Sequence, residues 1–153
     1  MLNILTFTIN NAKYGFNILQ VKEVNDNLNY SVVPTSDKRI RGLLNIRGQI
    51  ITIFDLKMIL GLGEAFFSKT TKNIILKSES ETENLVKEYQ IKLSSNDVIG
   101  FMVDKVNDVI ELEKVRIQPP PANNTKKYIQ GIVQFDNELL TILNVNEMAL
   151  NNI

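Results

Sequence analysis

Cysteine and histidine are both absent from the 153-residue chain. Without cysteine there is no disulfide framework and no thiolate nucleophile, which is compatible with a reducing compartment. Without histidine the chain lacks the commonest general base and the commonest metal ligand, so neither a Ser-His-Asp site nor a Cys-His site can be built. We therefore expect a protein that is not an enzyme and that holds no metal and no cofactor.

An excess of one charge is also missing, because 17 basic residues balance 17 acidic ones. Binding to nucleic acid or to an anionic membrane surface requires a basic excess, so neither is expected as the main function. No apolar run is long enough to cross a membrane, and the N-terminal MLNILTFTIN lacks the basic leader of a signal peptide. The sequence predicts a soluble, cytoplasmic protein.

Hydrophobic residues make up 44% of the chain, mostly in short, β-branched runs bounded by turn residues, a pattern that predicts strands. We expect strands at 2–9, 14–18, 40–46, 50–54, 73–77, 87–93, 98–103, 106–110, 129–135 and 138–143. Helices are expected to be few and short. Asp55 can cap one over 56–60 and Asn144 one over 145–150, whereas the prolines at 119–121 require a loop.

Two segments of the first half recur in the second half in the same order. YGFNILQVKEV (14–24) resembles IGFMVDKVNDV (99–109), 85 positions later. IRGLLNIRGQIITIFDL (40–56) resembles IQGIVQFDNELLTILNV (129–145), 89 positions later. This internal repeat predicts two similar units. We expect an all-β fold of two small barrels, or a sandwich, with about five strands in each unit and a groove between the units.

The two units are expected to pack together into one domain over 1–153. The first unit is expected over 12–78 and the second over 84–143. The strand at 2–9 and the helix at 145–150 lie outside these limits and are the segments expected to cross between the units.

Arginine is concentrated in one part of the chain. Of the four arginines, Arg39, Arg41 and Arg47 fall within nine positions. An arginine in an apolar β segment is costly unless it is paired or exposed for a purpose. Arg47 and Gly48 lie between two expected strands, where glycine's access to positive φ suits a tight hairpin turn. The role of Arg47 is therefore a specific question.

The internal repeat bears on that question, because Asp136 stands in the second copy where Arg47 stands in the first. The fold of the repeat does not need arginine there. Two interpretations stay open. Arg47 is either a turn residue, exposed or paired internally with Glu23 or Asp55, or a recognition residue at the mouth of the groove.

Two other patterns could indicate a catalytic or phosphate-binding site, but we prefer a structural explanation for each. Asp104 and Asp108 have the residue types of an acid–base pair, but they lie at a hairpin between two apolar strands. Gly61 and Gly63 have the composition of a phosphate-binding loop, but such a loop opens a helix, and these glycines end one. Neither pattern supports an enzymatic function.

The stretch GLLNIRGQIITIFDL (42–56) resembles the signature of CheW-like domains, the coupling proteins of bacterial chemotaxis. That signature is an apolar strand, Asn, an apolar residue, Arg-Gly, a second apolar strand and Asp-Leu. YGFNILQVKEV, GFMVDKVNDVIEL and GIVQFDNELLTILNVNEM resemble three further motifs of the family, in the family's order. The resemblance runs from about residue 3 to residue 150.

The resemblance implies two SH3-like β-barrels with a shared core and a non-enzymatic adaptor. Such adaptors bind the cytoplasmic tip of chemoreceptors and the regulatory domain of the histidine kinase CheA, with which they also build rings. Receptor contact is implied at Val21, Glu23, Asn45 and Arg47, and kinase contact at Ile18. Gly42 and Gly48 are expected as structural turn residues.

Three alternatives remain. Within the family, the chain could be an excised CheW-like regulatory domain of a CheA or CheV-type protein. From a different class, it could be a small β-barrel nucleic-acid-binding module, although no basic–aromatic face is evident. A hydrolytic or transfer enzyme would need converging carboxylates in a deep pocket.

Overall fold

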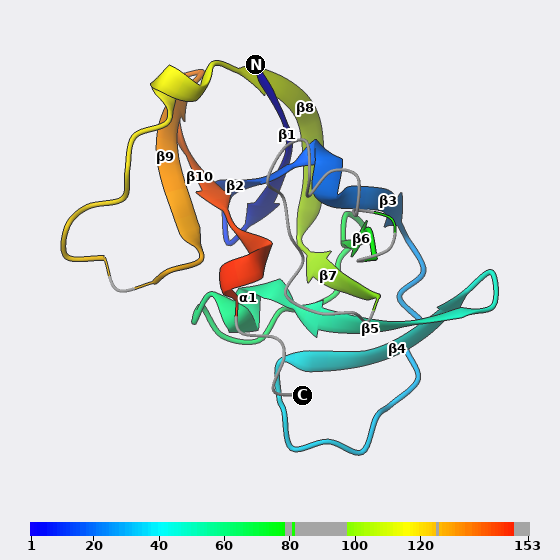
Figure 1. Cartoon of the computed structure of the whole chain (residues 1–153). Coiled ribbons are helices and arrows are strands. Elements are labelled where there is room, and N and C mark those ends of the chain that lie inside the picture. Colours follow the sequence, from blue (N-terminus) through cyan, green and yellow to red (C-terminus); the bar gives the residue numbers. More distant parts are fainter. Residues whose placement is uncertain (79–80, 82–97, 125, 149–153) are drawn as a thin grey trace.

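The computed structural model describes residues 1–78, 81, 98–124 and 126–148. The strands of this described part form two five-stranded sheets (Figure 1). The first sheet has the order β3 (Val21–Asn25), β6 (Lys72–Leu76), β7 (Ile99–Val103), β5 (Gln49–Asp55) and β4 (Ile40–Ile46). The second sheet has the order β8 (Lys105–Leu112), β1 (Leu2–Ile9), β2 (Ala12–Asn17), β10 (Glu138–Leu143) and β9 (Ile129–Phe135). The all-β prediction of two five-stranded units is confirmed.

Among the strands that the structure describes, the chain crosses between the sheets twice. It leaves the second sheet after β2 through the short 3₁₀ helix η1 (Ile18–Gln20), and it returns between β7 and β8. Asn17 caps η1, since its side-chain oxygen accepts a hydrogen bond from the Leu19 amide at 3.0 Å. Ile18 therefore lies in this crossing and not at the end of a strand, as its alternation with Tyr14 and Phe16 had predicted.

The strand pairing does not follow the expected limits of 12–78 and 84–143. β2 lies in the second sheet beside β10, and β7 lies in the first sheet beside β5. Each unit thus contributes one strand to the other sheet, as the strand at 2–9 also does by pairing with β8. Residues 84–97, including the strand predicted at 87–93, lie outside the described residues.

The internal repeat is visible in the sheets. The repeat makes β2 and β3 equivalent to β7 and β8, and β4 and β5 equivalent to β9 and β10. Each strand then has the same position in its own sheet as its equivalent has in the other sheet, with β1 and β6 as the remaining pair. The one parallel pair also matches, since β10 runs parallel to β2 and β5 runs parallel to β7. The two repeated segments therefore occupy equivalent places in two equivalent sheets.

Three apolar clusters hold this arrangement together. One lies inside the first sheet around Ile53, and one lies inside the second sheet around Ile142. The largest joins the two sheets and contains the ring series Phe7, Phe16 and Phe101, with neighbouring ring centroids 5.0 and 5.5 Å apart. Aromatic contacts of this kind add to the free energy gained from burial. The shared cluster makes the two barrels one packed body.

The helices described by the structure are short, as expected. Asp55 caps α1 (Leu56–Ile59) by accepting from the Met58 amide. Two 3₁₀ helices, η2 (Lys114–Arg116) and η3 (Val145–Glu147), follow later in the chain. Asn144 caps η3 as predicted, but the expected helix over 145–150 is only a 3₁₀ turn in its described part. No helix in the described ranges is long and apolar enough to span a membrane.

Gly42 corrects one prediction, because it is not a turn residue. It lies inside β4, at a register shift opposite Ile53, and its φ is +151°. A Cβ on Gly42 would lie 2.5 Å from the carbonyl oxygen of Ser31, which forms an isolated bridge with Leu43. Glycine is needed there for close approach of two backbones. Gly48, by contrast, has a φ of +83° in the predicted turn.

Candidate functional site

The turn between β4 and β5 presents Arg47 at the tip of a two-stranded hairpin. Arg47 has a φ of +52° and Gly48 one of +83°, so both turn residues are left-handed, as a two-residue hairpin turn requires. The Asn45 side-chain oxygen accepts a hydrogen bond from the Gly48 amide at 2.9 Å. Asn45 thus stabilises the turn that carries Arg47, which explains the combination Asn-x-Arg-Gly in physical terms.

Arg47 is paired with Glu23. Its Nη2 donates to Glu23 Oε1 at 2.7 Å, a short charge-assisted hydrogen bond. The Arg47 side chain is 70% exposed, whereas that of Glu23 is 25% exposed. Asp55, the other partner considered from the sequence, is fully buried and accepts from the amides of Met58 and Ala65. The internal pair is therefore with Glu23.

This pair bridges two separated parts of the first sheet. Glu23 lies on the edge strand β3, and Arg47 lies at the tip of the hairpin that forms the opposite edge. A second link runs beside it, where Lys22 Nζ donates to Gln49 Oε1 at 3.4 Å. We call this line of contacts, formed by Lys22, Glu23, Arg47 and Gln49, the first seam.

The structure brings three of the five predicted contact residues together and separates two. Glu23, Asn45 and Arg47 lie at the first seam. Val21 is buried at 9% exposure and packs in the cluster between the sheets, so its side chain supports the site from within. Ile18 is half-buried against the same cluster, in the crossing helix η1.

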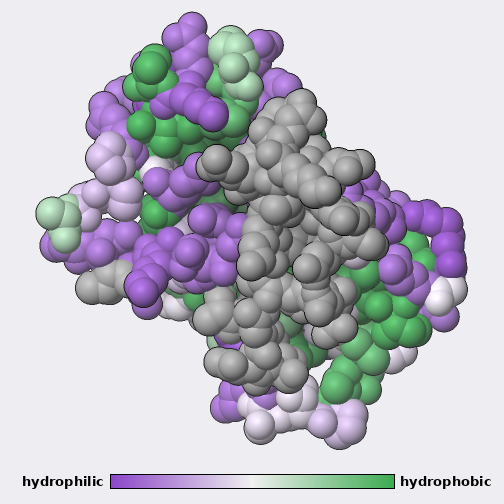
Figure 2. Space-filling view, viewed as in Figure 1, coloured by the Kyte–Doolittle hydropathy of each residue, from purple (hydrophilic) through white to green (hydrophobic). Residues whose placement is uncertain are grey.

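Sequence reasoning missed the flanks of the site. Lys22 and Gln49 were not singled out, although Lys22 lies between two predicted contact residues and Gln49 follows the predicted turn residue Gly48. Val24 and Ile50 are also exposed there, at 43% and 56%. Figure 2 shows hydrophobic surface along the β4–β5 hairpin, at the right of the view. Exposed apolar residues next to an exposed ion pair are typical of protein-binding surfaces.

The other clustered arginines have local partners. Arg39 donates to both oxygens of Asp37, at 3.0 and 2.8 Å, and this hydrogen bonding lowers the pKa of the Asp37 carboxyl. Arg41 donates to Glu64 at 3.0 Å and lies 4.9 Å from the centre of the Phe67 ring. Of the three, Arg47 is the most exposed, since the side chains of Arg39 and Arg41 expose 29% and 18%.

The acidic side chains of the described residues do not cluster into a metal centre. Those residues contain no group of three or more His, Cys, Asp or Glu able to hold a metal ion. Asp104 accepts a hydrogen bond from the Asn10 amide at 2.8 Å, across two neighbouring turns. The predicted hairpin at Asp104 is wrong, because β7 and β8 lie in different sheets and Asp104 lies where the chain crosses between them.

The comparisons with known proteins agree on one family. The CheW-like domain model matches residues 3–151. Chemotaxis protein CheW of Helicobacter pylori is 25% identical over 152 residues (97% of this chain, 81% of that protein), and its Bacillus subtilis counterpart is 27% identical over 146 residues (93% and 83%). The crystal structure of the scaffolding protein TtCheW from Thermoanaerobacter tengcongensis matches with a TM-score of 0.78 and 27% identity, covering 96% of this chain and 86% of that one. The chain therefore belongs to the CheW-like domain family, and it is a non-enzymatic coupling adaptor of chemotaxis.

Proposed function

We propose that the protein couples chemoreceptors to the histidine kinase CheA in the cytoplasm, and that the receptor tip docks on the first seam. The observation that carries this proposal is the 70% exposed Arg47, held at 2.7 Å from Glu23 on a rigid hairpin tip. Arginine is favoured in interfaces because its planar fork retains free donors after one of them has been used. A hydrogen-bond acceptor on the receptor would bind to the remaining donors of the Arg47 guanidinium.

The mechanism is physical and involves no bond-making. The adaptor holds the kinase against the receptor, and small receptor shifts change the kinase through packed interfaces. This requires a stiff body, which the cluster shared by the two sheets supports. We place kinase contact around Ile18, because the crossing helix η1 lies at the junction of the sheets and Ile18 remains partly exposed.

The test is receptor binding by an Arg47→Ala variant of the full chain. We expect the dissociation constant for a receptor-tip fragment to rise about tenfold or more, which corresponds to about 1.4 kcal/mol. Arg116→Ala is the matched control, because Arg116 is also exposed but lies in the other barrel, where it donates to the Gln134 carbonyl. Isothermal titration calorimetry measures both.

Folding must be measured on the same samples. Exposed ion pairs contribute little to stability, so Arg47→Ala should lower the free energy of unfolding by less than about 1 kcal/mol. Unchanged receptor binding in Arg47→Ala would exclude the recognition role. A large loss of stability would instead identify the Glu23 pair as a structural feature.

A further inference from the structure

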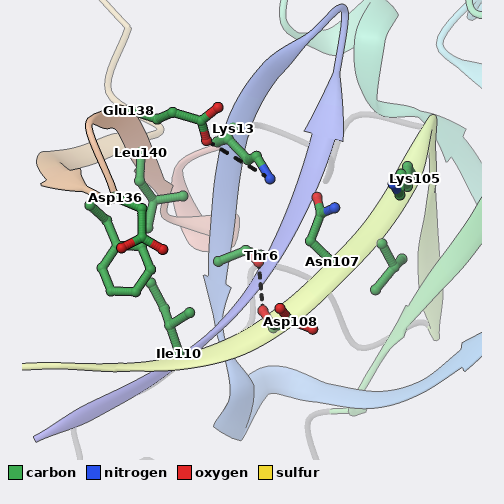
Figure 3. Close-up of a pocket in the computed structure, with 11 residues that line it drawn as sticks. Thr6, Lys13, Lys105, Asn107, Asp108, Ile110, Asp136, Glu138 and Leu140 are labelled. Atoms are coloured by element: carbon green, nitrogen blue, oxygen red, sulfur yellow. Dashed lines mark hydrogen bonds and ion pairs between the residues drawn. The ribbon is translucent and has the colours of Figure 1, made fainter.

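The second sheet has a hollow at the place equivalent to the first seam. The hollow has a volume of about 380 Å³ and lies between the edge strand β8 and the turn that joins β9 to β10. Its lining residues are Thr6, Lys13, Lys105, Val106, Asn107, Asp108, Ile110, Phe135, Asp136, Glu138 and Leu140. Figure 3 shows this opening, with Asp108 on β8 and Asp136 across from it. We call it the second seam.

The internal repeat relates the two seams residue by residue. Asp108 is the counterpart of Glu23, 85 positions later, and Asp136 is the counterpart of Arg47, 89 positions later. The backbones agree, since both edge strands have a register shift at this point and both turns have a left-handed first residue. The side chains differ, because the first seam pairs an arginine with a carboxylate, whereas the second seam has a carboxylate at both equivalent positions.

The two aspartates are available to a ligand. Within the described ranges, neither the Asp108 nor the Asp136 carboxylate takes part in a hydrogen bond or an ion pair. Thr6 Oγ1 donates to the backbone carbonyl of Asp108 at 2.5 Å, which fixes the strand and leaves the side chain free. Asn107 is occupied differently, since it accepts from the Thr8 hydroxyl at 2.8 Å.

The lysines of the hollow do not neutralise this pair. Lys13 lies 4.0 Å from Glu138 and is directed to that carboxylate in Figure 3. Lys105 lies at the far end of β8, on the opposite side of the hollow from Asp136. Three carboxylates and two lysines line the hollow, and within the described residues Asp108 and Asp136 are its two carboxylates without a cation partner.

We propose that the second seam binds the arginine side chain of a partner polypeptide, which supplies from outside the cation that Arg47 supplies within the first seam. The first seam points to this ligand, because there the guanidinium of Arg47 lies 2.7 Å from Glu23, the counterpart of Asp108. The hollow also has apolar walls at Val106, Ile110 and Leu140, against which the methylene stem of an arginine can pack. A guanidinium presents donors in several directions and can bridge two carboxylates.

This inference does not depend on which proteins the adaptor couples, since it concerns the chemistry of a site in the other barrel from Arg47. The probe is an N-acetylated, C-amidated Gly-Arg-Gly peptide, titrated into the full chain while amide chemical shifts are followed. We expect saturable shifts at Thr6, Asn107 and Asp136. The same peptide with citrulline, which is similar in shape and uncharged, should give none.

Variants assign the binding to the aspartates. Asp108→Asn and Asp136→Asn should each weaken binding of the arginine peptide about tenfold, as loss of a charge-assisted contact does. Asp136→Arg should abolish it, because the new guanidinium occupies the seam as Arg47 occupies the first one. Glu111→Gln is the matched control, since it removes a carboxylate from the same strand outside the hollow, and binding should be unchanged.

Each result decides the proposal. Non-saturable shifts, or shifts that persist unchanged in both Asn variants, would overturn it. A lysine peptide that binds as tightly as the arginine peptide would overturn the assignment to a guanidinium. Both Asn variants replace an exposed carboxylate by its isostere, so they are expected to fold, and the unfolding midpoint of each confirms this before binding is measured.

Discussion

The hairpins β4–β5 and β9–β10 share one backbone design. Each has a two-residue turn whose residues both have positive φ, and each has a register shift just before its buried glycine. Each also receives an isolated bridge, from Ser31 in the first hairpin and from Gln118 in the second. The hairpins even end alike, because the amides of Asp55 and Asn144 both donate at 2.7 Å to the residue before the hairpin.

The tips of the hairpins differ, and the difference is informative. Aspartate and asparagine tolerate the left-handed conformation, so Asp136 and Asn137 suit their turn locally. Arg47 occupies the same conformation without that advantage, at a cost of order 1 kcal/mol. The backbone tolerates either residue, which means that the side chain at the tip is free to serve recognition. Arg47 forms an ion pair across the first seam, whereas Asp136 forms none across the second within the described residues.

The buried glycines of the two hairpins allow the largest test of this equivalence. A Cβ on Gly42 would lie 2.5 Å from the Ser31 carbonyl oxygen, and one on Gly131 would lie 2.8 Å from the Gln118 carbonyl oxygen. Only Gly42 also has a positive φ. We expect Gly42→Ala to lower the free energy of unfolding by about 3 kcal/mol and Gly131→Ala by about 2 kcal/mol, measured by urea unfolding.

Gly61→Ala isolates the contribution of backbone conformation. Gly61 has a φ of +75°, and a Cβ there would meet no atom within 4 Å. Its loss of stability should be about 1 kcal/mol, because only strain is introduced. If Gly131→Ala left the free energy of unfolding unchanged, the bridge from Gln118 would be packed less closely than the bridge from Ser31. The two hairpins would then not be equivalent at their buried glycines.

The capping residues at the ends of the hairpins should differ by less. Asp55 is fully buried and accepts from the Met58 amide at 3.3 Å and the Ala65 amide at 2.9 Å. Asn144 accepts only from the Asn146 amide, at 3.1 Å. Asp55→Ala should cost about 2.5 kcal/mol, since it leaves the buried Ala65 amide without its acceptor, and Asn144→Ala about 1 kcal/mol. Thermal and urea unfolding of both variants check the order, and equal losses would contradict it.

Tyrosine ionisation compares the two barrels at high pH. Burial, opposed by the positive charge of Arg41, raises the pKa of Tyr30 to about 12 from an ordinary value of 10. Burial also raises the pKa of Tyr128 in the second barrel. A raised folded-state pKa means that the stability contribution is complete below pH 10 and is lost as the pH rises toward 12.

Difference absorbance of the phenolate measures this effect. Tyr30→Phe should remove the ionisation with a midpoint near pH 12 and should flatten the loss of stability between pH 10 and 12. Tyr128→Phe is the control in the other barrel. A Tyr30 that ionised at its ordinary pKa would show that the first barrel is open around this ring.

Much of the fold was predictable because it depends on periodic patterns. Alternating apolar residues specify the strands, and the repeat of 40–56 at 129–145 specifies two equivalent hairpins. The exchange of β2 was not predictable, because Ile18 continues the alternation of β2 and nothing in the pattern shows that the chain leaves the sheet there. Pairing partners depend on tertiary packing, which short strands of similar composition do not encode individually.

The candidate site was predictable in part. Arg47 was identified by its contrast with Asp136, and Glu23 was one of two partners considered for it. Val21, which the resemblance implies as a receptor contact, is buried at 9% exposure beside a register shift in β3, and its contact with a receptor stays a prediction. The second seam was not predicted at all, since Asp108 and Asp136 come to line one hollow only in the folded chain.

Exchanging the tip residues gives the smallest and most direct comparison of the seams. Arg47→Asp places a carboxylate opposite Glu23, and Asp136→Arg places a guanidinium opposite Asp108. We expect the first change to destabilise the fold by about 0.5–1 kcal/mol and the second to stabilise it by about 0.5 kcal/mol. Both effects are small because both sites are exposed to solvent.

Urea unfolding at low and high salt measures both effects, and screening by salt should reduce both of them. A salt-independent loss in Arg47→Asp would mean that packing of the arginine stem, and not its charge, closes the first seam. Stabilisation of Asp136→Arg in low salt would show that an arginine at the second tip can pair across its seam as Arg47 does across the first.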